Sequence, residues 1–135
     1  MSDLTLNNNR LTHLPASIGD LTSLTDLYVS NNKLTYLPDS IGGLVSLSYL
    51  NVSANQLTHL PDSICGLLSL SHLEVSNNQL ADIPASVGNW SSLTYLNVNN
   101  NPMTSTEKGK DKVRKRFKRA GMKLIVDNRP YNLRF

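Results

Sequence analysis

The chain repeats one pattern every 23 residues through most of its length. The pattern runs Leu-x-x-Leu-x-(Leu/Val)-x-x-Asn-x-Leu and then continues as x-x-Leu-Pro-x-x-Ile-x-x-Leu with small variations. A fixed period in the twenties predicts a solenoid, because each copy is one structural unit that buries its apolar face against the next. The copies begin at Met1, Leu24, Leu47, Leu70 and Leu93, and the fifth stops at its asparagine turn.

The first stretch of each copy alternates apolar and polar residues, as Leu27, Tyr28 and Val29 do. Alternation of this kind is typical of a half-buried strand, so Leu27 and Val29 are expected to point inward and Tyr28 outward. Stacked copies then form a parallel sheet whose outward residues line a concave face. The predicted inward pairs are Leu4 and Leu6, Leu27 and Val29, Leu50 and Val52, Leu73 and Val75, and Leu96 and Val98.

An asparagine follows each strand, where the chain has to turn inward, away from the sheet. An amide side chain carries both a donor and an acceptor, so it can pair with backbone groups of its own turn and of the next repeat. Without such a partner, a buried backbone group costs roughly 1–3 kcal/mol. The predicted buried ladder consists of Asn9, Asn32, Asn55, Asn78 and Asn101.

Apolar residues recur at every third position after the asparagine, as in residues 57–67. This spacing suits 3₁₀ or short helical turns on the convex side. Proline fits the start of such a turn, because its φ is fixed and it has no N–H. Cys65 takes the place that glycine holds in the other turns. The prolines are Pro15, Pro38, Pro61 and Pro84, and the glycines are Gly19, Gly42 and Gly88.

The motif L-P-x-S-I-G-x-L stands as LPASIGDL at residues 14–21 and as LPDSIGGL at residues 37–44. Through this motif, residues 1 to about 103 resemble the leucine-rich repeat family in its 23-residue subtype. The subtype is similar to plant intracellular Ras-group-related repeats, Ras-pathway scaffolds of animals and many small bacterial repeat proteins. The resemblance implies an α/β solenoid with a parallel concave sheet, short convex 3₁₀ or helical turns, and a non-enzymatic role in protein–protein interaction.

Residues 104–135 are expected to form a basic cap that follows the repeats of residues 1–103. Residues 104–107, TSTE, match a capping box and predict the start of a helix. Gly121 is the expected end of that helix. Three residues recur at helical spacing and are expected to face the core: Val113, Phe117 and Ala120.

Residues 122–127 alternate less clearly but are rich in apolar side chains, and they predict a closing strand. That strand is expected to lie beside the strand of Leu96 and to cover the edge of the sheet. Residues 128–135, which contain Tyr131 and Phe135, are expected to fold back over the core. The chain starts inside a repeat, which favours either a piece of a longer protein or self-association through the N-terminal edge.

Charge divides the chain near the same boundary. Residues 1–102 hold two bases and seven acids, a net charge of −5, whereas residues 103–135 hold eleven bases and three acids, a net charge of +8. The overall net charge of +3 therefore describes the tail and not the concave surface.

The outward strand positions predict a binding surface. Neighbouring parallel strands lie about 4.8 Å apart, so Tyr28, Tyr49, His72 and Tyr95 are expected to form one continuous patch. Tyrosine is favoured at protein interfaces because it buries a large area and keeps a polar group, although it also suits strands in general. We predict that a protein partner contacts Asp26, Tyr28, Tyr49, Asn51, His72, Glu74, Tyr95 and Asn97.

A competing hypothesis rests on the basic run of residues 108–119, KGKDKVRKRFKR. A basic amphipathic helix can bind nucleic acid or an anionic surface, but the same run also suits the solvated face of a cap helix. A third hypothesis is a trimmed or designed scaffold with no native ligand. The residues of the anionic-partner hypothesis are Lys112, Lys115, Arg116, Lys118 and Arg119.

No pattern in the sequence indicates an enzyme or a cofactor, and none is expected. His13 and His59 lie two repeats apart, about 10 Å by the strand spacing, which is too far for a shared metal. Cys65 is the only cysteine and is expected to be a buried apolar thiol. A single cysteine excludes an internal disulfide and favours a cytoplasmic setting. No apolar run approaches the roughly 20 residues that a membrane span needs.

Overall fold

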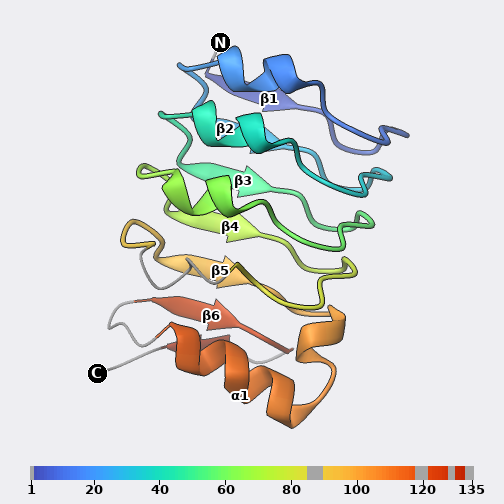
Figure 1. Cartoon of the computed structure of the whole chain (residues 1–135), viewed down its shortest axis with the longest axis vertical. Coiled ribbons are helices and arrows are strands. Elements are labelled where there is room, and N and C mark those ends of the chain that lie inside the picture. The colour runs from blue at the N-terminus through green and yellow to red at the C-terminus, as the bar shows by residue number, and fades with distance from the viewer. Residues whose placement is uncertain (1, 85–89, 118–121, 128–129, 133–135) are drawn as a thin grey trace.

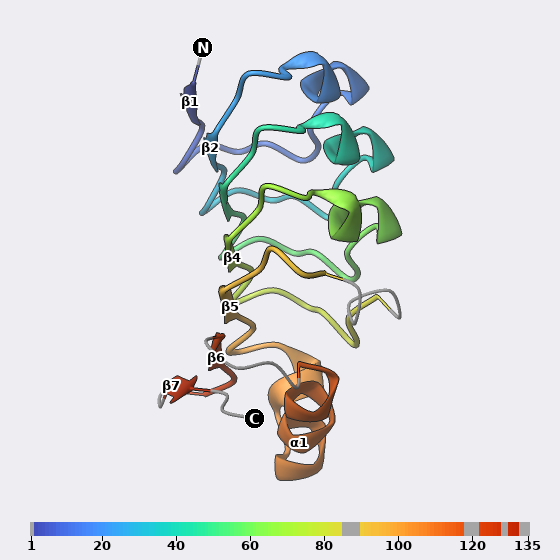
Figure 2. The same cartoon turned by 90° about the vertical axis from the view of Figure 1, so that its left-hand side faces the viewer.

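The computed structural model describes residues 2–84, 90–117, 122–127 and 130–132. The chain forms a coil of stacked repeats in which the strands lie on one side and 3₁₀ helices lie on the other (Figures 1 and 2). In the described part of the chain, seven strands follow one another in chain order across a single sheet. The strands are β1 (Asp3–Thr5), β2 (Asp26–Tyr28), β3 (Tyr49–Asn51), β4 (His72–Glu74), β5 (Tyr95–Asn97), β6 (Lys123–Ile125) and β7 (Pro130–Asn132).

The parallel sheet is confirmed, and its register follows the sequence period. Leu27 of β2 pairs with Leu50 of β3, and Leu50 pairs with Leu73 of β4. Every pairing from β1 to β6 is parallel. The inward leucines and valines from residue 27 onward are buried in one continuous core, whereas Leu4 and Leu6 of the first repeat are only partly buried.

The asparagine ladder is present, but it runs toward the preceding repeat and not toward the next one. Asn55 Nδ2 donates to the carbonyls of Val29 and Val52 at 2.9 and 3.1 Å, and Asn55 Oδ1 accepts from the N–H of Leu34 at 3.0 Å. Asn9 has no described repeat before it, is exposed, and bonds only within its own turn. The side chains of Asn32, Asn55, Asn78 and Asn101 are all buried.

The residue just before each ladder asparagine has a positive φ, near 55° to 61°. Asparagine tolerates this left-handed conformation, but alanine is strained there because its Cβ approaches the following carbonyl. Four of the five positions are asparagine and one is Ala54. Asn100 Nδ2 also donates to Asn77 Oδ1 at 2.9 Å, so neighbouring side chains of this column bond to each other.

Replacing Ala54 with asparagine is therefore expected to raise the free energy of unfolding by about 1 kcal/mol, the order of the left-handed penalty that it relieves. Urea denaturation followed by circular dichroism measures the change. The reverse substitution, Asn31→Ala, should lower stability by a similar amount at an equivalent turn. Equal stability of the Ala54→Asn variant and the parent would show that the turn carries no strain.

The convex side carries the predicted 3₁₀ helices η1 (Ala16–Asp20), η2 (Asp39–Gly43) and η3 (Asp62–Gly66). Each begins directly after a proline whose φ lies between −66° and −68°. The helices stack so closely that a Cβ at Gly43 would lie 2.7 Å from the carbonyl oxygen of Gly19. The corresponding turn of the fourth repeat, at residues 85–89 with Gly88, lies outside the described residues.

The cap helix begins two residues later than the sequence indicates. α1 spans Glu107–Arg116, and the Thr106 side chain caps it by accepting from the Gly109 N–H at 3.0 Å. Thr104 instead ends a short 3₁₀ helix, η5 (Pro102–Thr104), where its hydroxyl donates to the carbonyl of Val98 at 3.1 Å. The capping-box prediction failed here because Thr104 is buried against the last repeat and cannot serve the helix.

α1 covers the C-terminal end of the solenoid (Figure 2). Val113 and Phe117 are buried in the common core, with 3% and 2% of their surface exposed. The described helix ends at Arg116, and Ala120 and the predicted stop at Gly121 lie outside the described residues.

The chain after α1 adds two strands to the sheet. β6 pairs with β5 in parallel and places Leu124 beside Leu96, as predicted. β7 was not predicted: residues 130–132 pair with β6 in the antiparallel direction and extend the sheet by one strand. Whether the side chains of residues 128–135 cover the core stays a prediction, because residues 128–129 and 133–135 lie outside the described part of the chain. A reversal after β6 lets backbone groups at its outer edge find partners without another full repeat.

Candidate functional site

The outward side chains of the sheet form columns across the strands. The first column runs from Asp3 through Asp26, Tyr49, His72 and Tyr95 to Lys123. The second column runs from Thr5 through Tyr28, Asn51, Glu74 and Asn97 to Ile125. The eight residues predicted to contact a partner occupy consecutive positions of these two columns on β2 to β5, and each is partly exposed.

Four rings in these columns stack into what we call the aromatic ladder: Tyr28, Tyr49, His72 and Tyr95. The ring centroids of Tyr28 and Tyr49 are 5.1 Å apart and tilted by 39°. Tyr49 and His72 stack at 4.3 Å, and His72 and Tyr95 stack at 3.9 Å with their planes within 4° of parallel. The structure thus brings together the four rings that the sequence places in neighbouring repeats.

The carboxylates of Asp26 and Glu74 contact polar atoms of the aromatic ladder. The Tyr28 hydroxyl donates to Asp26 Oδ2 at 3.2 Å. Glu74 Oε1 lies 3.3 Å from His72 Nε2. Because each acid bonds ring atoms of the ladder, the rings are oriented before any partner arrives.

The tyrosines of the ladder resist ionisation. Burial, followed by the negative charge of Glu74, raises the pKa of Tyr95 to about 12. Burial, followed by Glu74, also raises the pKa of Tyr49 above its ordinary value. Burial, followed by the hydrogen bond to Asp26, raises the pKa of Tyr28. All three hydroxyls therefore stay neutral around pH 7 and retain a proton that can be donated to an acceptor.

Asn51 and Asn97 support the ladder as well as lining it. Asn51 Oδ1 accepts from the Ser53 hydroxyl at 2.7 Å and from the Ser53 N–H at 3.0 Å. Asn97 Oδ1 accepts from the Asn99 N–H at 3.0 Å. These internal bonds fix the amides, so the pair contributes rigidity to the surface.

Lys123 joins the surface although the sequence did not single it out. It follows Tyr95 in register and places Nζ 5.8 Å from the centroid of the Tyr95 ring, a cation–π distance. The 23-residue frame ends before α1, so no spacing argument connects Lys123 with the first column. The predicted pairing of residues 122–127 with the strand of Leu96 was the one hint of this contact. That pairing alone does not say which residue of β6 lies beside Tyr95.

The basic residues of the competing hypothesis are divided by the fold. Arg116 Nη1 donates to the carbonyl of Ile83 at 2.9 Å, and Arg116 also lies 3.5 Å from Asp82. Lys112 lies 3.7 Å from the same carboxylate. Lys115 is exposed, whereas Lys118 and Arg119 lie outside the described residues. Part of the positive charge thus ties α1 to the fourth repeat.

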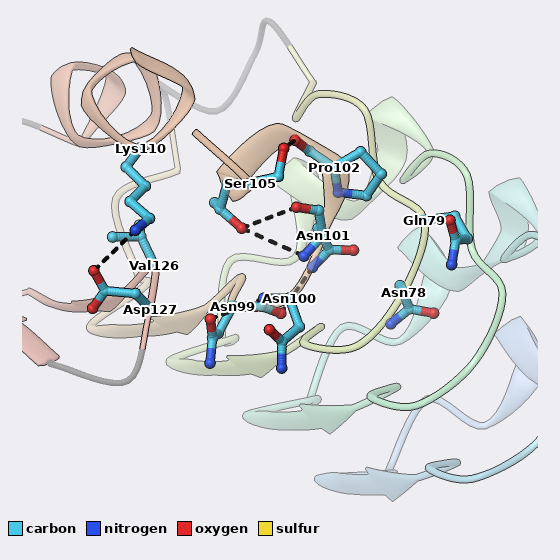
Figure 3. Close-up of a pocket in the computed structure, with 11 residues that line it drawn as sticks. Asn78, Gln79, Asn99, Asn100, Asn101, Pro102, Ser105, Lys110, Val126 and Asp127 are labelled. Atoms are coloured by element: carbon cyan, nitrogen blue, oxygen red, sulfur yellow. Dashed lines mark hydrogen bonds and ion pairs between the residues drawn. The ribbon is translucent and has the colours of Figure 1, made fainter. Parts of the chain in front are cut away.

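A polar hollow of about 520 Å³ lies where the last repeats meet the cap (Figure 3). Asn99, Asn100 and Asn101 line it on one side, and Lys110, Val126 and Asp127 line it on the other. Lys110 Nζ lies 3.3 Å from Asp127 and 3.2 Å from Glu107. The Glu107 hydrogen bond, acting against desolvation, raises the pKa of Lys110. The pairing with Asp127 joins α1 to the chain after β6, which suits a structural joint.

The described residues contain no group of three or more His, Cys, Asp or Glu side chains that could hold a metal ion. His13 Nδ1 and His59 Nδ1 each lie 3.2 Å from the threonine hydroxyl that precedes them, at the rim of the sheet. Cys65 is buried with 8% of its surface exposed. None of the helices in the described part of the chain is long and apolar enough to cross a membrane.

Comparisons with known proteins agree with this architecture. A leucine rich repeat family model matches residues 1–57 and 38–80. A leucine-rich repeat protein of Leptospira interrogans is 35% identical, with a TM-score of 0.82 over 90% of this chain and 30% of its own. The leucine-rich repeat domain of a Shigella effector is 32% identical, with a TM-score of 0.62 over 75% of this chain and 41% of its own.

A third solved structure, the functional domain of InlJ from Listeria monocytogenes, is 25% identical, with a TM-score of 0.65. That match covers 75% of this chain and 21% of InlJ, so the chain spans less than half the length of each of these three proteins. No curated protein matches the sequence. The family match over more than half of the chain, together with the stacked strands, 3₁₀ turns and asparagine ladder, shows that this protein belongs to the leucine-rich repeat family.

Proposed function

We propose that the chain is a non-enzymatic binding module that holds a protein partner on the concave sheet. The observation that carries the proposal is the aromatic ladder, four rings stacked at 3.9 to 5.1 Å on the concave face. Domains of the leucine-rich repeat family generally serve in protein–protein interaction and are typically not enzymes. The placement of the partner on this face, and on these residues, is our inference.

The ladder has the properties of a binding hot spot. Stacked rings carried by paired strands lose little freedom when a partner covers them, so less of the interaction energy is spent on ordering the surface. Tyrosine also buries a large area while its hydroxyl remains available for a hydrogen bond. Binding energy at interfaces is concentrated in a few such aromatic residues. The Tyr49 hydroxyl is neutral around pH 7 because its pKa is raised above the ordinary value, so it can donate to a partner carbonyl, whereas the Tyr28 hydroxyl already donates to Asp26.

Two finer points belong to the same proposal. Paired residues of neighbouring strands are 23 positions apart, and the 3₁₀ turns begin after prolines. Both features support membership of the 23-residue subtype that resembles plant and bacterial relatives. The cytoplasmic setting that the single cysteine favours stays a prediction.

Replacing Tyr49 and Tyr95 together with alanine is expected to leave the fold intact and to remove partner binding. Both side chains are partly exposed and lie outside the buried core, so their loss creates no cavity inside the repeats. Each truncated hot-spot residue typically costs about 2 kcal/mol or more of binding free energy, and the pair also interrupts the stack on both sides of His72. Affinity capture from extracts of the source cells, with circular dichroism on both proteins, measures the effect.

The matched control is Tyr36→Ala with Leu68→Ala, because both residues are exposed apolar side chains away from the ladder, with 44% and 76% of their surface exposed. The control should capture the same partner as the parent chain. Capture that persists in the folded Tyr49→Ala, Tyr95→Ala variant, or that disappears in the control, would move the binding surface away from the concave sheet.

A further inference from the structure

The two ends of the aromatic ladder differ in charge. At the C-terminal end, Lys123 supplies a cation to the ring of Tyr95, with Nζ 5.8 Å from the ring centroid. At the N-terminal end, Tyr28 contacts Tyr49 on the side of β3, and its other side faces β1. The residues that β1 presents there are Asp3 and Thr5, and both are exposed. The last ring at this end therefore has no aromatic neighbour on β1.

Two carboxylates border this end ring. Asp26 accepts from the Tyr28 hydroxyl at 3.2 Å, and Asp3 is its direct neighbour in the sheet register. Among the described residues, the ion pairs involve neither Asp3 nor Asp26. Residues 1–102 contain only two basic residues, Arg10 and Lys33, and neither lies on a strand. The N-terminal end thus presents a ring and two acids where the other end presents a ring and a lysine.

The concave columns as a whole are acidic on the repeats. The charged residues of the two columns on β1 to β5 are Asp3, Asp26 and Glu74, with Lys123 following on β6. Glu74 lies 3.3 Å from His72 inside the ladder. Charge complementarity therefore favours a partner with positive charge over the N-terminal half of the face.

We propose that the N-terminal end of the ladder receives an arginine side chain of the partner. The guanidinium stacks on the open side of the Tyr28 ring and donates to the carboxylates of Asp26 and Asp3. This inference rests on the proposed function, because it names the chemistry of the partner on the same concave face. The partner segment is accordingly basic where it crosses β1 and β2.

Arginine suits this end better than lysine for a geometric reason. A planar guanidinium can stack on an aromatic face and still direct its N–H groups sideways to carboxylates. Such charge-assisted bonds are stronger than neutral ones, and contact with the ring face adds a cation–π attraction. The ammonium group of lysine is a compact, strongly hydrated charge. It has no planar face that could stack on the ring while its N–H groups bond to both carboxylates.

The test uses short fluorescein-labelled Gly/Ser peptides that carry several arginines, several lysines or several citrullines. Citrulline has the shape of arginine without its charge, so the comparison isolates the guanidinium. Fluorescence anisotropy at low salt measures their affinity for the full chain. The arginine peptide is expected to bind most tightly, the lysine peptide less tightly, and the citrulline peptide weakest.

Variants locate the peptide on the surface. Asp3→Asn with Asp26→Asn should weaken the arginine peptide by about tenfold or more, the range seen when one member of a close charge pair is removed. Asparagine at position 26 can still accept from the Tyr28 hydroxyl, so the substitution removes charge and preserves the local bond. Tyr28→Leu should also weaken binding, whereas Tyr28→Phe, which keeps the ring, should retain most of it.

The matched control is Asp39→Asn with Asp62→Asn, which changes the net charge equally at exposed positions of η2 and η3 on the convex side. It should leave the affinity of the arginine peptide unchanged. Equal weakening by both double variants, or equal binding of the arginine and citrulline peptides, would overturn the inference.

The outcome is separable from that of the proposed function. If Tyr49→Ala with Tyr95→Ala abolishes capture of the natural partner while the Asp3→Asn, Asp26→Asn variant binds the arginine peptide as the parent does, only the arginine inference fails. If capture survives the tyrosine substitutions, the proposed function fails, whatever the peptides show.

Discussion

Replacing Asn55 with alanine is expected to lower the free energy of unfolding by roughly 1–3 kcal/mol, the usual cost of leaving one buried backbone group without a partner. The substitution removes the Asn55 oxygen that accepts from the Leu34 N–H at 3.0 Å. The Val29 carbonyl loses the Asn55 amide at 2.9 Å but keeps the Asn32 amide at 3.2 Å. Both groups belong to the preceding repeat, so the variant weakens the joint between two repeats as well as its own turn. Urea denaturation followed by circular dichroism measures the loss.

The control for this prediction is Asn9→Ala, at the equivalent position of the first repeat. Asn9 is exposed and bonds only the carbonyls of Leu6 and Asn7 in its own turn. Water can replace those bonds, so the expected loss is small. If the two variants unfold at the same urea concentration, the stability of the solenoid does not depend on the buried ladder.

Replacing Phe117 with alanine is expected to destabilise the protein by roughly 3–5 kcal/mol, the usual cost of removing a buried phenylalanine. Phe117 is 2% exposed and packs, with Val113, at the end of the core that begins in the repeats. The substitution opens a cavity between α1 and the last strands of the sheet. Thermal unfolding monitored by circular dichroism should show a clear fall in melting temperature.

Lys115→Glu is the control for the cap, because Lys115 is exposed on the same helix and has no described ion pair. Its effect on stability should be much smaller, since surface charges contribute little. A Phe117→Ala variant that melts like the parent chain, combined with loss of partner binding in Lys115→Glu, would make the basic helix the binding element in place of the concave sheet.

These predictions depend on residues whose roles were visible to different degrees in the sequence. The inward position of Leu50 and the outward position of Tyr49 follow from period-two alternation in a strand. The 23-residue period then places Tyr49, His72 and Tyr95 in one column without any tertiary information, since equal spacing gives equal register. The same spacing predicts the proline-initiated turns, which are local structures.

Tertiary contacts decided what happens where the repeat stops. Asn9 and Asn55 have the same place in the pattern, yet only Asn55 is buried, because only Asn55 has a described repeat stacked before it. Thr104 matches a helix cap in sequence, but burial against Val98 leaves Thr106 to cap α1. A local sequence pattern reports only on residues that are close in the chain. The burial of Asn55 and the choice of Thr106 as the cap depend on residues that are close in space, so the pattern could not predict them.

The 23-residue repeat predicts the solenoid, its parallel register and the columns of the concave face, because a repeating unit imposes one arrangement on every copy. Packing in three dimensions sets the antiparallel β7, the bond of Arg116 to the carbonyl of Ile83, and the position of Lys123 over Tyr95. The contacts of Arg116 and Lys123 join the non-repeating tail to the last repeats. No period relates the two segments, so their register is set by the packing of α1 and by the pairing of β6 with the edge of β5.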